Sequence, residues 1–268
     1  MAEATPRIVA TDMDGTLLRS DGSLSARTRA AIAAAEEAGV TVVFVTARPP
    51  RRLDEFADVV GAHGVALCAN GAYVYDVARR TVTEQSLIER VVLEDIVAEL
   101  RASIPRIVFA VERDLGIFRE DGFASNIWGK EGDAAERLAD LTEIPAGKLL
   151  GRCDEMDPAE FHQRVESVLG GRLELGYSGA VGLAEITAKG VTKASGLARW
   201  CREHGVEASR VWAFGDMPND LPMLSWAGRA HAVANAHPEV RAVADEVVPA
   251  NDDDGVGQVL ERIVAELA

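Results

Sequence analysis

Two aspartates and a glycine directly follow an apolar run near the start of the chain. Residues 8–11 are apolar or β-branched, and Asp12, Asp14 and Gly15 come next. Because residues two positions apart point to the same side of an extended chain, both carboxylates should face one volume past the end of a strand. Two adjacent carboxylates repel, so they would share a proton, bind a hard divalent cation, or act separately as nucleophile and acid. Gly15 would let the backbone turn so that the following amides can face an anion, although a turn rich in solvated acids also fits these residues.

A second apolar run ends in a hydroxyl that could hold an anion. Residues 41–45 are β-branched or aromatic, the pattern of a parallel strand buried on both faces, and Thr46 follows them. Open α/β sheets bind ligands past the carboxyl ends of their strands, so Thr46 could donate to a phosphoryl oxygen there. Thr46 could equally cap a helix that begins near Pro49. Arg48 would ordinarily be a solvated surface residue.

A second acidic loop occurs about 200 residues later in the chain. Residues 210–214 have the pattern of another buried strand, and Asp216, Asn219 and Asp220 follow it. Asp220 alone would suit the N-cap of a short helix. Two acidic loops on separate strand ends are nevertheless hard to explain as coincident turns.

Two lysines and two asparagines are further candidates for the same edge. Lys193 lies at the predicted start of a helix, where a cation opposes the positive helix end and so favours a compensating anion. Lys189 is its rival, and either one would ordinarily be a solvated lysine. Asn70 and Asn235 follow predicted strands, where an asparagine can serve only as a turn residue.

These segments resemble the four motifs of the haloacid dehalogenase superfamily of phosphotransferases, in the order of that family. Residues 12–16, Asp-Met-Asp-Gly-Thr, resemble the first motif, and residues 46–48, Thr-Ala-Arg, resemble the Thr-Gly-Arg form of the second, which is common among sugar-phosphate phosphatases. Residues 189–193, Lys-Gly-Val-Thr-Lys, are similar to the third motif of the Cof-like branch, whose second lysine is functional. Residues 215–220, Gly-Asp-Met-Pro-Asn-Asp, are similar to the fourth.

The resemblance implies a two-step phosphoryl transfer that requires Mg2+. Asp12 would attack phosphorus, while Asp14 would protonate the leaving alcohol and then activate the water that cleaves the aspartyl phosphate. Mg2+ would be held by Asp12, the backbone carbonyl of Asp14 and Asp216. The residues expected to bind the phosphoryl group are Thr46, Lys193 and Gly15, and those expected to support the site are Asp220, Asn219, Arg48, Asn70 and Asn235.

The composition limits the classes of partner. The chain has 268 residues, 48% of them hydrophobic, with a formal net charge of -15. Such a negative charge argues against nucleic acid and anionic membranes as partners. The resemblance implies a small phosphorylated molecule as the substrate. The start lacks a leader pattern and no apolar stretch reaches about 18 residues, so we expect a soluble, cytoplasmic monomer or weak homodimer. The three cysteines, Cys68, Cys153 and Cys201, are too far apart to indicate a zinc site or a disulfide framework.

The order of the expected elements predicts a doubly wound, Rossmann-like α/β core that contains an insertion. Strands and helices alternate from residue 8 onward, with helices expected over residues 25–38, where Ser25 is the N-cap, and over 53–60. The alternation resumes at residue 188, so the core is assigned to residues 1–81 and 188–268.

The middle of the chain has the pattern of an α+β domain. Residues 82–187 contain short alternating strands and two amphipathic helices, expected over 91–101 and 157–169. The resemblance implies that this segment is a class II cap that supplies contacts to the substrate. Four residues are candidates for those contacts by type alone: Arg113, Trp128, Lys130 and Tyr177.

The sequence as a whole predicts a Mg2+-dependent phosphatase of small phosphomonoesters, with sugar phosphates as the expected substrates. Two alternatives stay open at this point. A phosphomutase or phosphotransferase of the same superfamily would use the same residues but pass the phosphoryl group to a sugar. A receiver-type signalling module also combines acids, a threonine and a lysine around a phosphorylated aspartate, but such modules are about half this length and lack an insertion.

Overall fold

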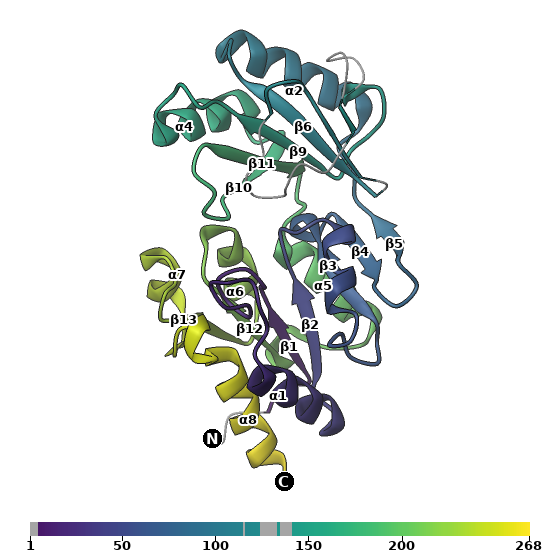
Figure 1. The fold of residues 1–268 in the computed structure, drawn as a ribbon, viewed down its shortest axis with the longest axis vertical. Coiled ribbons are helices and arrows are strands. Elements are labelled where there is room, and N and C mark those ends of the chain that lie inside the picture. Colours follow the sequence, from purple (N-terminus) through teal and green to yellow (C-terminus); the bar gives the residue numbers. More distant parts are fainter. Residues whose placement is uncertain (1–4, 115, 124–132, 135–140) are drawn as a thin grey trace. The chain divides into compact units, whose positions relative to one another are not determined.

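The chain divides into two compact units in the computed structural model, which describes residues 5–114, 116–123, 133–134 and 141–268. The first unit combines Met1–Thr83 with Lys193–Ala268, and the second is Glu84–Thr192. Figure 1 shows the elements of each unit along the chain. The boundaries predicted for the insertion stay a prediction, because compactness alone does not establish where a domain folds independently.

The first unit is built on a mostly parallel sheet in which β1 occupies a central position. The strands lie side by side in the order β14-β13-β12-β1-β2-β3-β4-β5. Their bounds are β1 (Ile8–Thr11), β2 (Thr41–Val45), β3 (Val65–Cys68), β4 (Tyr73–Asp76), β5 (Thr81–Gln85), β12 (Val211–Gly215), β13 (Arg229–Val233) and β14 (Glu246–Val248). Strand β1 pairs in parallel with both β2 and β12, and all four of its residues are buried, as expected for a strand covered on both faces. The predicted α/β fold class is confirmed.

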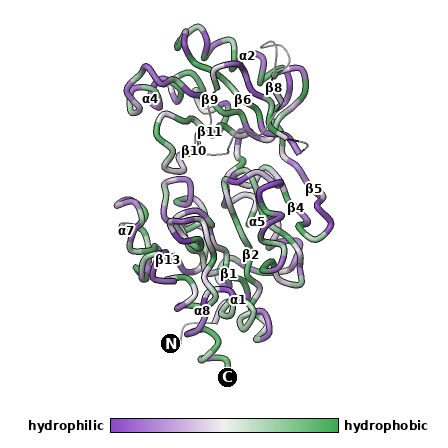
Figure 2. Tube along the Cα trace, viewed as in Figure 1, coloured by the Kyte–Doolittle hydropathy of each residue, from purple (hydrophilic) through white to green (hydrophobic). Residues whose placement is uncertain are grey.

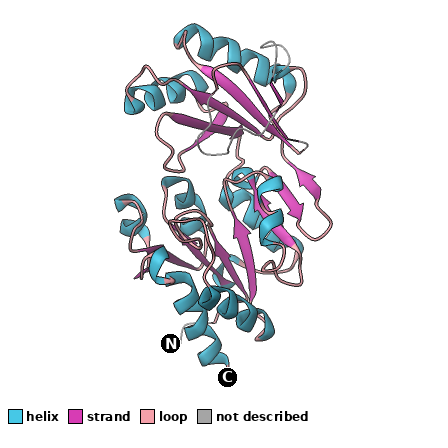
Figure 3. Ribbon diagram, viewed as in Figure 1, coloured by secondary structure: helices cyan, strands magenta, loops and turns pink. Residues whose placement is uncertain are grey.

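Helices lie before, between or after the parallel strands of this unit (Figure 3). They are α1 (Ala26–Glu37), α5 (Lys193–Glu203), α6 (Leu221–Trp226), α7 (Pro238–Val243) and α8 (Gly255–Leu267). The predicted N-cap of α1 is confirmed, since the hydroxyl of Ser25 accepts a hydrogen bond from the amide of Thr28 at 3.0 Å. Helices α1 and α8 pack against each other, and α5 packs against β3.

The prediction of a helix over residues 53–60 is wrong. Two single 3-10 turns, Pro50–Arg52 and Asp54–Phe56, take its place. The segment is short, so it would gain few helical hydrogen bonds for the entropy of nucleating a helix. The 3-10 turns already bury its apolar residues, because Leu53 is 0% exposed and Phe56 is 4% exposed.

The second unit has a separate six-stranded sheet, in the order β10-β11-β9-β6-β7-β8. Its strands are β6 (Val108–Arg113), β7 (Gly116–Arg119), β8 (Asp133–Ala134), β9 (Lys148–Arg152), β10 (Leu173–Gly176) and β11 (Leu183–Ala188), and its helices include α2 (Arg90–Ser103) and α4 (Pro158–Leu169). Both predicted helices are confirmed within one or two residues at each end. Central strand β9 was not predicted, because a five-residue run with glycine at its fourth position gives little periodicity.

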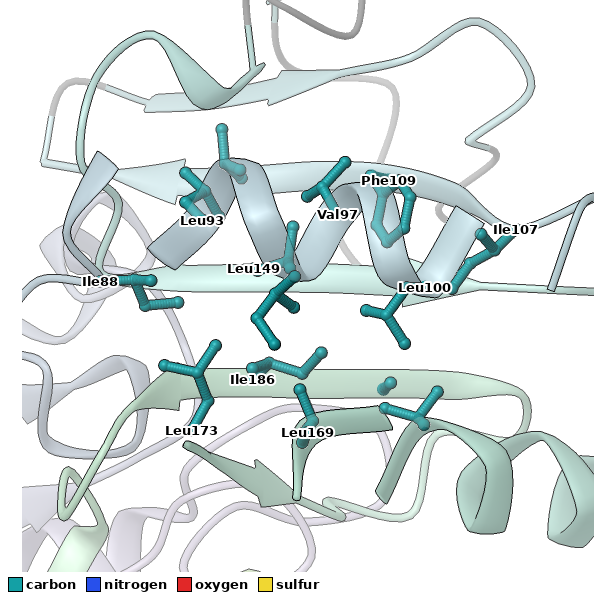
Figure 4. Close-up of a cluster of buried hydrophobic side chains, with 14 of the residues drawn as sticks. Ile88, Leu93, Val97, Leu100, Ile107, Phe109, Leu149, Leu169, Leu173 and Ile186 are labelled. Carbon is teal, nitrogen blue, oxygen red and sulfur yellow. The ribbon is translucent and has the colours of Figure 1, made fainter. Parts of the chain in front are cut away.

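The helices of the second unit cover one face of its sheet. Figure 4 shows Leu93, Val97 and Leu100 of α2 close to Leu149 and Ile186 of the strands. Residues that alternate with this set along β6, β9 and β11 face the opposite side of the sheet and contribute to a second, smaller apolar cluster. Figure 2 shows the hydropathy of each residue along the chain, with hydrophobic residues in central strands such as β1 and β2.

The four candidate substrate contacts of this unit are placed unequally. Trp128 and Lys130 lie outside the described residues. The guanidinium of Arg113 donates to the backbone carbonyls of Leu141 and Ile144 at 2.8 Å each, so it supports its own unit. The ring of Tyr177 lies edge-on to His162 at 5.2 Å, and its role in binding substrate stays a prediction. Among the described residues, we find no helix that is long and apolar enough to span a membrane.

Candidate active site

Three neighbouring strands deliver the main candidate residues to one edge of the first sheet. Strand β1 lies between β2 and β12, and Thr11 at its end pairs with Phe44 on one side and Phe214 on the other. Asp12, Thr46 and Asp216 come directly after or close to these paired ends. The parallel register therefore brings together residues that are far apart in the sequence (Figure 1).

A buried ammonium group connects two of the acidic residues. Lys193 is the first residue of α5 and is 1% exposed. Its Nζ donates to Asp12 Oδ1 at 2.7 Å and to Asp220 Oδ1 at 2.6 Å. The other oxygen of Asp220 accepts from the backbone amides of Asp216 and Met217, both at 3.0 Å. Lys193 therefore fixes the loop after β1 against the loop after β12.

Of the two candidate lysines, only Lys193 is buried among carboxylates, while Lys189 is exposed. Burial lowers the pKa of Lys193, but the charges of Asp12 and Asp220 and their hydrogen bonds raise it by more, so the net pKa is raised. Lys193 is thus charged at every physiological pH.

The buried carboxylates carry more negative charge than one lysine neutralises. Burial is the main cause that raises the pKa of Asp12 well above its ordinary value; Lys193 opposes the shift, while Asp220 and Asp216 add to it. Burial and the charge of Asp220 likewise raise the pKa of Asp216 to about 6. Three buried carboxylates therefore share one ammonium group, and a bound cation would relieve their repulsion.

The same three carboxylates could hold a metal ion. Asp12, Asp216 and Asp220 each offer an oxygen, and these oxygens all lie within 4.8 Å of one another. Oxygen donors of this kind suit hard divalent cations. The side chain of Asp14 is outside this group and is 53% exposed, so any contact of this residue with the metal would come from its backbone.

Arg48 holds the carboxylate of Asp14. Its Nε and Nη2 donate to the two oxygens of Asp14 at 2.7 and 2.6 Å, a paired geometry that is stronger than a single hydrogen bond. The guanidinium also lies 5.4 Å from the centre of the Phe56 ring and 3.3 Å from Glu55 Oε1. Its side chain is only 13% exposed, so Arg48 is not the solvated surface residue of the ordinary interpretation.

The hydroxyls of Thr46 and Thr16 have different partners. Thr46 is fully buried, and its Oγ1 accepts from the amide of Arg48 at 3.1 Å. It does not cap a helix, because the following 3-10 turn has Pro49 as its N-cap. Thr16 lies within the first motif but was given no role from sequence, and its hydroxyl donates to Asp216 Oδ1 at 2.8 Å.

Gly15 needs both its backbone conformation and its lack of a side chain. Its φ is 79°, which is in the left-handed region. A Cβ atom on Gly15 would lie 2.4 Å from Asp216 Oδ2. The first loop therefore lies directly against the carboxylate of Asp216.

The three candidate asparagines all contact this part of the first unit. Asn70 is 5% exposed with a left-handed φ of 57°, and its Oδ1 accepts from Asn219 Nδ2 at 3.1 Å. Such a conformation costs free energy for a residue other than glycine, so the surrounding contacts must maintain it. Asn235 Nδ2 donates to the backbone carbonyl of Gly15 at 2.7 Å.

The raised pKa of Asp216 predicts an unusual dependence of stability on pH in the metal-free protein. The folded pKa of about 6 is above the ordinary value of 3.8, so folding favours the protonated form. The contribution of protonated Asp216 to the free energy of unfolding is complete below the pKa of this residue in the unfolded chain. This contribution is lost as the pH rises through about 6. Thermal unfolding between pH 5 and pH 7, compared with Asp216→Asn, should show a wild-type loss that the variant lacks.

A divalent cation should reverse this loss, since it binds the ionised carboxylates and compensates their repulsion. The thermal shift caused by Mg2+ should therefore grow with pH in the wild type and be small in Asp216→Asn. Parallel pH profiles for the two proteins without metal would contradict the assigned electrostatics.

Comparisons with known proteins match nearly the whole chain. A family model described as haloacid dehalogenase-like hydrolase matches residues 9–260. The pyridoxal phosphate phosphatase YbhA of Escherichia coli is 29% identical, over 96% of this chain and 98% of the relative. The 5-amino-6-(5-phospho-D-ribitylamino)uracil phosphatase YcsE of Bacillus subtilis is 27% identical, over 96% of each chain.

Solved structures extend the likeness to the fold. The crystal structure of SMU.1108c from Streptococcus mutans has a TM-score of 0.85 at 25% identity and covers 97% of this chain and 100% of its own. BT1666 from Bacteroides thetaiotaomicron, a phosphatase of the same superfamily, has a TM-score of 0.82 at 23% identity, over 98% and 96% of the two chains. With the family model matching nearly the whole sequence, the chain belongs to the haloacid dehalogenase-like hydrolases and is a phosphoric monoester hydrolase of that superfamily.

Proposed function

We propose that the protein is a Mg2+-dependent phosphatase that hydrolyses small phosphomonoesters through an aspartyl-phosphate intermediate. The observation that carries the proposal is the buried ammonium group of Lys193, held between Asp12 and Asp220 at the edge of the sheet. A permanent positive charge beside a potential nucleophile is suited to a phosphoryl group, which carries negative charge throughout its transfer.

Asp12 is the proposed nucleophile. It is 5% exposed, and Lys193 fixes one of its oxygens. A carboxylate that is already oriented loses little entropy when it attacks. Avoiding this entropy loss can supply a large part of an enzyme's rate enhancement. Thr46, Gly15 and Lys193 would bind the phosphoryl oxygens, with charge and donors placed where negative charge develops.

Asp14 is the proposed acid and base. It lies two residues from Asp12 and its side chain is 53% exposed, so it can reach a leaving group and a water molecule. Arg48 occupies both of its oxygens in the absence of substrate. A carboxyl group that donates a proton must give up at least one of these two hydrogen bonds, so Arg48 has to release Asp14 in part during turnover.

Mg2+ is the proposed cofactor, bound by Asp12, Asp216 and the backbone carbonyl of Asp14, with Asp220 in support. When bound, it would neutralise part of the phosphoryl charge and offset the repulsion among the aspartates. The support for this choice is the chemistry of the donors, which are all oxygens, and the raised pKa values that three buried carboxylates produce.

The substrate is proposed to be a small phosphomonoester, with a sugar phosphate as the first choice. The named relatives act on pyridoxal phosphate and on a phosphorylated ribitylaminouracil, which supports a compact phosphorylated molecule. A phosphomutase of the same superfamily would need the same residues, and product analysis separates it from a phosphatase. We also propose that the second unit is a cap that selects the substrate, and that the protein is cytoplasmic and monomeric or weakly dimeric.

Release of free phosphate from a panel of phosphorylated sugars, nucleotides and cofactors tests this function. We expect release with Mg2+, none in excess chelator, and full recovery when Mg2+ is restored. Ca2+ should not substitute, because it favours a higher coordination number and longer distances to its ligands. Full activity in excess chelator would contradict the metal site, and transfer to a second sugar without free phosphate would favour the mutase.

Conservative changes at the two aspartates of the first motif should separate their roles. Asp12→Asn should give no phosphoenzyme, because an amide oxygen is a poor nucleophile. Asp14→Asn should still react with an aryl phosphate whose leaving group needs no proton, and the intermediate should accumulate because its hydrolysis lacks a base. The mass of each intact variant, measured after mixing with the aryl phosphate and Mg2+, reports a phosphoryl adduct. An adduct that persists in Asp12→Asn would reverse the two roles.

A further inference from the structure

A second asparagine continues the contacts that Asn235 makes with the first loop. Asn251 begins the 3-10 turn Asn251–Asp253 after β14 and is 5% exposed. Its side-chain amide donates to the carbonyl of Leu18 at 2.9 Å, and its backbone amide donates to Asn235 Oδ1 at 3.1 Å. Asn235 in turn donates to the carbonyl of Gly15 at 2.7 Å. Two asparagine side chains from two different loops therefore hold the two ends of one segment, Gly15 and Leu18, and the backbone amide of Asn251 links the two loops.

The segment that they hold is the tight turn of the first motif. The carbonyl of Met13 accepts from the amides of Thr16, Leu17 and Leu18, at 3.3, 3.0 and 2.8 Å. The two carbonyls bound by the asparagines lie on either side of Thr16, whose hydroxyl donates to Asp216 Oδ1. A change in the position of this turn would therefore move the contacts of Gly15 and Thr16 with Asp216 directly.

We propose that Asn251 is a positioning residue for the phosphoryl-transfer site: its side chain holds the carbonyl of Leu18 and, alongside Asn235 on Gly15, sets the turn that follows Asp12. The inference rests on the proposed function, because it concerns the reaction for which that turn is used. Asn251 itself touches none of the three buried aspartates; it acts on the backbone of the turn beside them.

The amide side chain is required for its ability to donate. Aspartate has the same shape but offers only acceptors when ionised, so at position 251 it would set an oxygen against the carbonyl oxygen of Leu18. The aspartates next to Asn251 contact residues 19 and 20, which follow the turn, through hydrogen bonds and an ion pair. Asp252 bonds to Ser20 and Asp254 bonds to Arg19, and the Ser20 contact is exposed. Exposed bonds of this kind contribute little, so they should not replace the buried contact of Asn251.

The test compares Asn251→Asp with Asp253→Asn, a matched change between the same two side chains at an exposed position of the same turn. The probe is p-nitrophenyl phosphate with Mg2+, and vanadate is the inhibitor because it adopts the geometry of the transferring phosphoryl group. We expect kcat/KM and vanadate affinity to fall by about tenfold or more in Asn251→Asp, since a buried donor has become a buried acceptor. Asp253→Asn should match the wild type in both.

A variant of the other asparagine that holds this turn gives a second test of the proposal. Asn235→Asp removes the donor to Gly15 at an exposed position, so it should fold even if Asn251→Asp does not. The fold-decrease in kcat/KM of the double variant should be much smaller than the product of the fold-decreases of the two single variants, because both side chains act on one turn. Losses that multiply independently, or equal kcat/KM in Asn251→Asp and Asp253→Asn, would overturn the proposal.

Hydrogen exchange separates this inference from the proposed function. The amides of Thr16, Leu17 and Leu18 should exchange faster in Asn251→Asp than in Asp253→Asn, with unchanged protection of strand β1. If the wild type released no phosphate but this difference appeared, the proposed function would fail while the positioning of the turn stood. Equal exchange in the two variants would overturn the positioning role whatever the activity.

Discussion

The active edge of the first unit depends on one buried interaction, the ammonium group of Lys193 between Asp12 and Asp220. A lysine that is 1% exposed loses the solvation of its charge, and it is stable there only because two carboxylates bind it. The same contact joins the first turn of α5 to the loops after two different strands. Removing the lysine would leave uncompensated carboxylates, so this interaction decides both the charge and the shape of the site.

The negative charges of the buried aspartates exceed the positive charge of Lys193. Burial raises the pKa of Asp12 and raises that of Asp216 to about 6; repulsion among the three carboxylates adds to both shifts, and the single lysine opposes them without cancelling them. Acids with these raised pKa values destabilise the folded protein at neutral pH when no cation is present. The proposed role of Mg2+ follows from this cost, because the cation would stabilise the fold and prepare the site in one step. A general charge of -15 would otherwise repel a phosphate ester from the whole molecule.

The sequence was most informative where buried strands end in polar residues, because strand periodicity and parallel pairing together determine which loops meet. Residue types alone did not separate Lys189 from Lys193, since their difference in burial depends on tertiary packing, and only the resemblance favoured Lys193. The helix expected over residues 53–60 is absent because local propensity is weak in so short a segment. Arg48 was expected to support the site, but its contact with Asp14 could not be predicted, and Asn251 was given no role, because each contact depends on a partner that is distant in the chain. The local signal at that turn is an asparagine followed by three aspartates, and this pattern does not reveal that Asn251 is buried.

Trapping the nucleophile would test the central claim most directly. Beryllium fluoride forms a complex with aspartate that mimics an aspartyl phosphate, and a crystal structure of the protein with Mg2+ and beryllium fluoride would identify the residue that carries it. We predict that the beryllium atom is bonded to a carboxylate oxygen of Asp12, with fluorine atoms near Lys193 and Thr46. A complex on Asp14, or an empty Asp12 beside bound Mg2+ at saturating fluoride, would contradict the account.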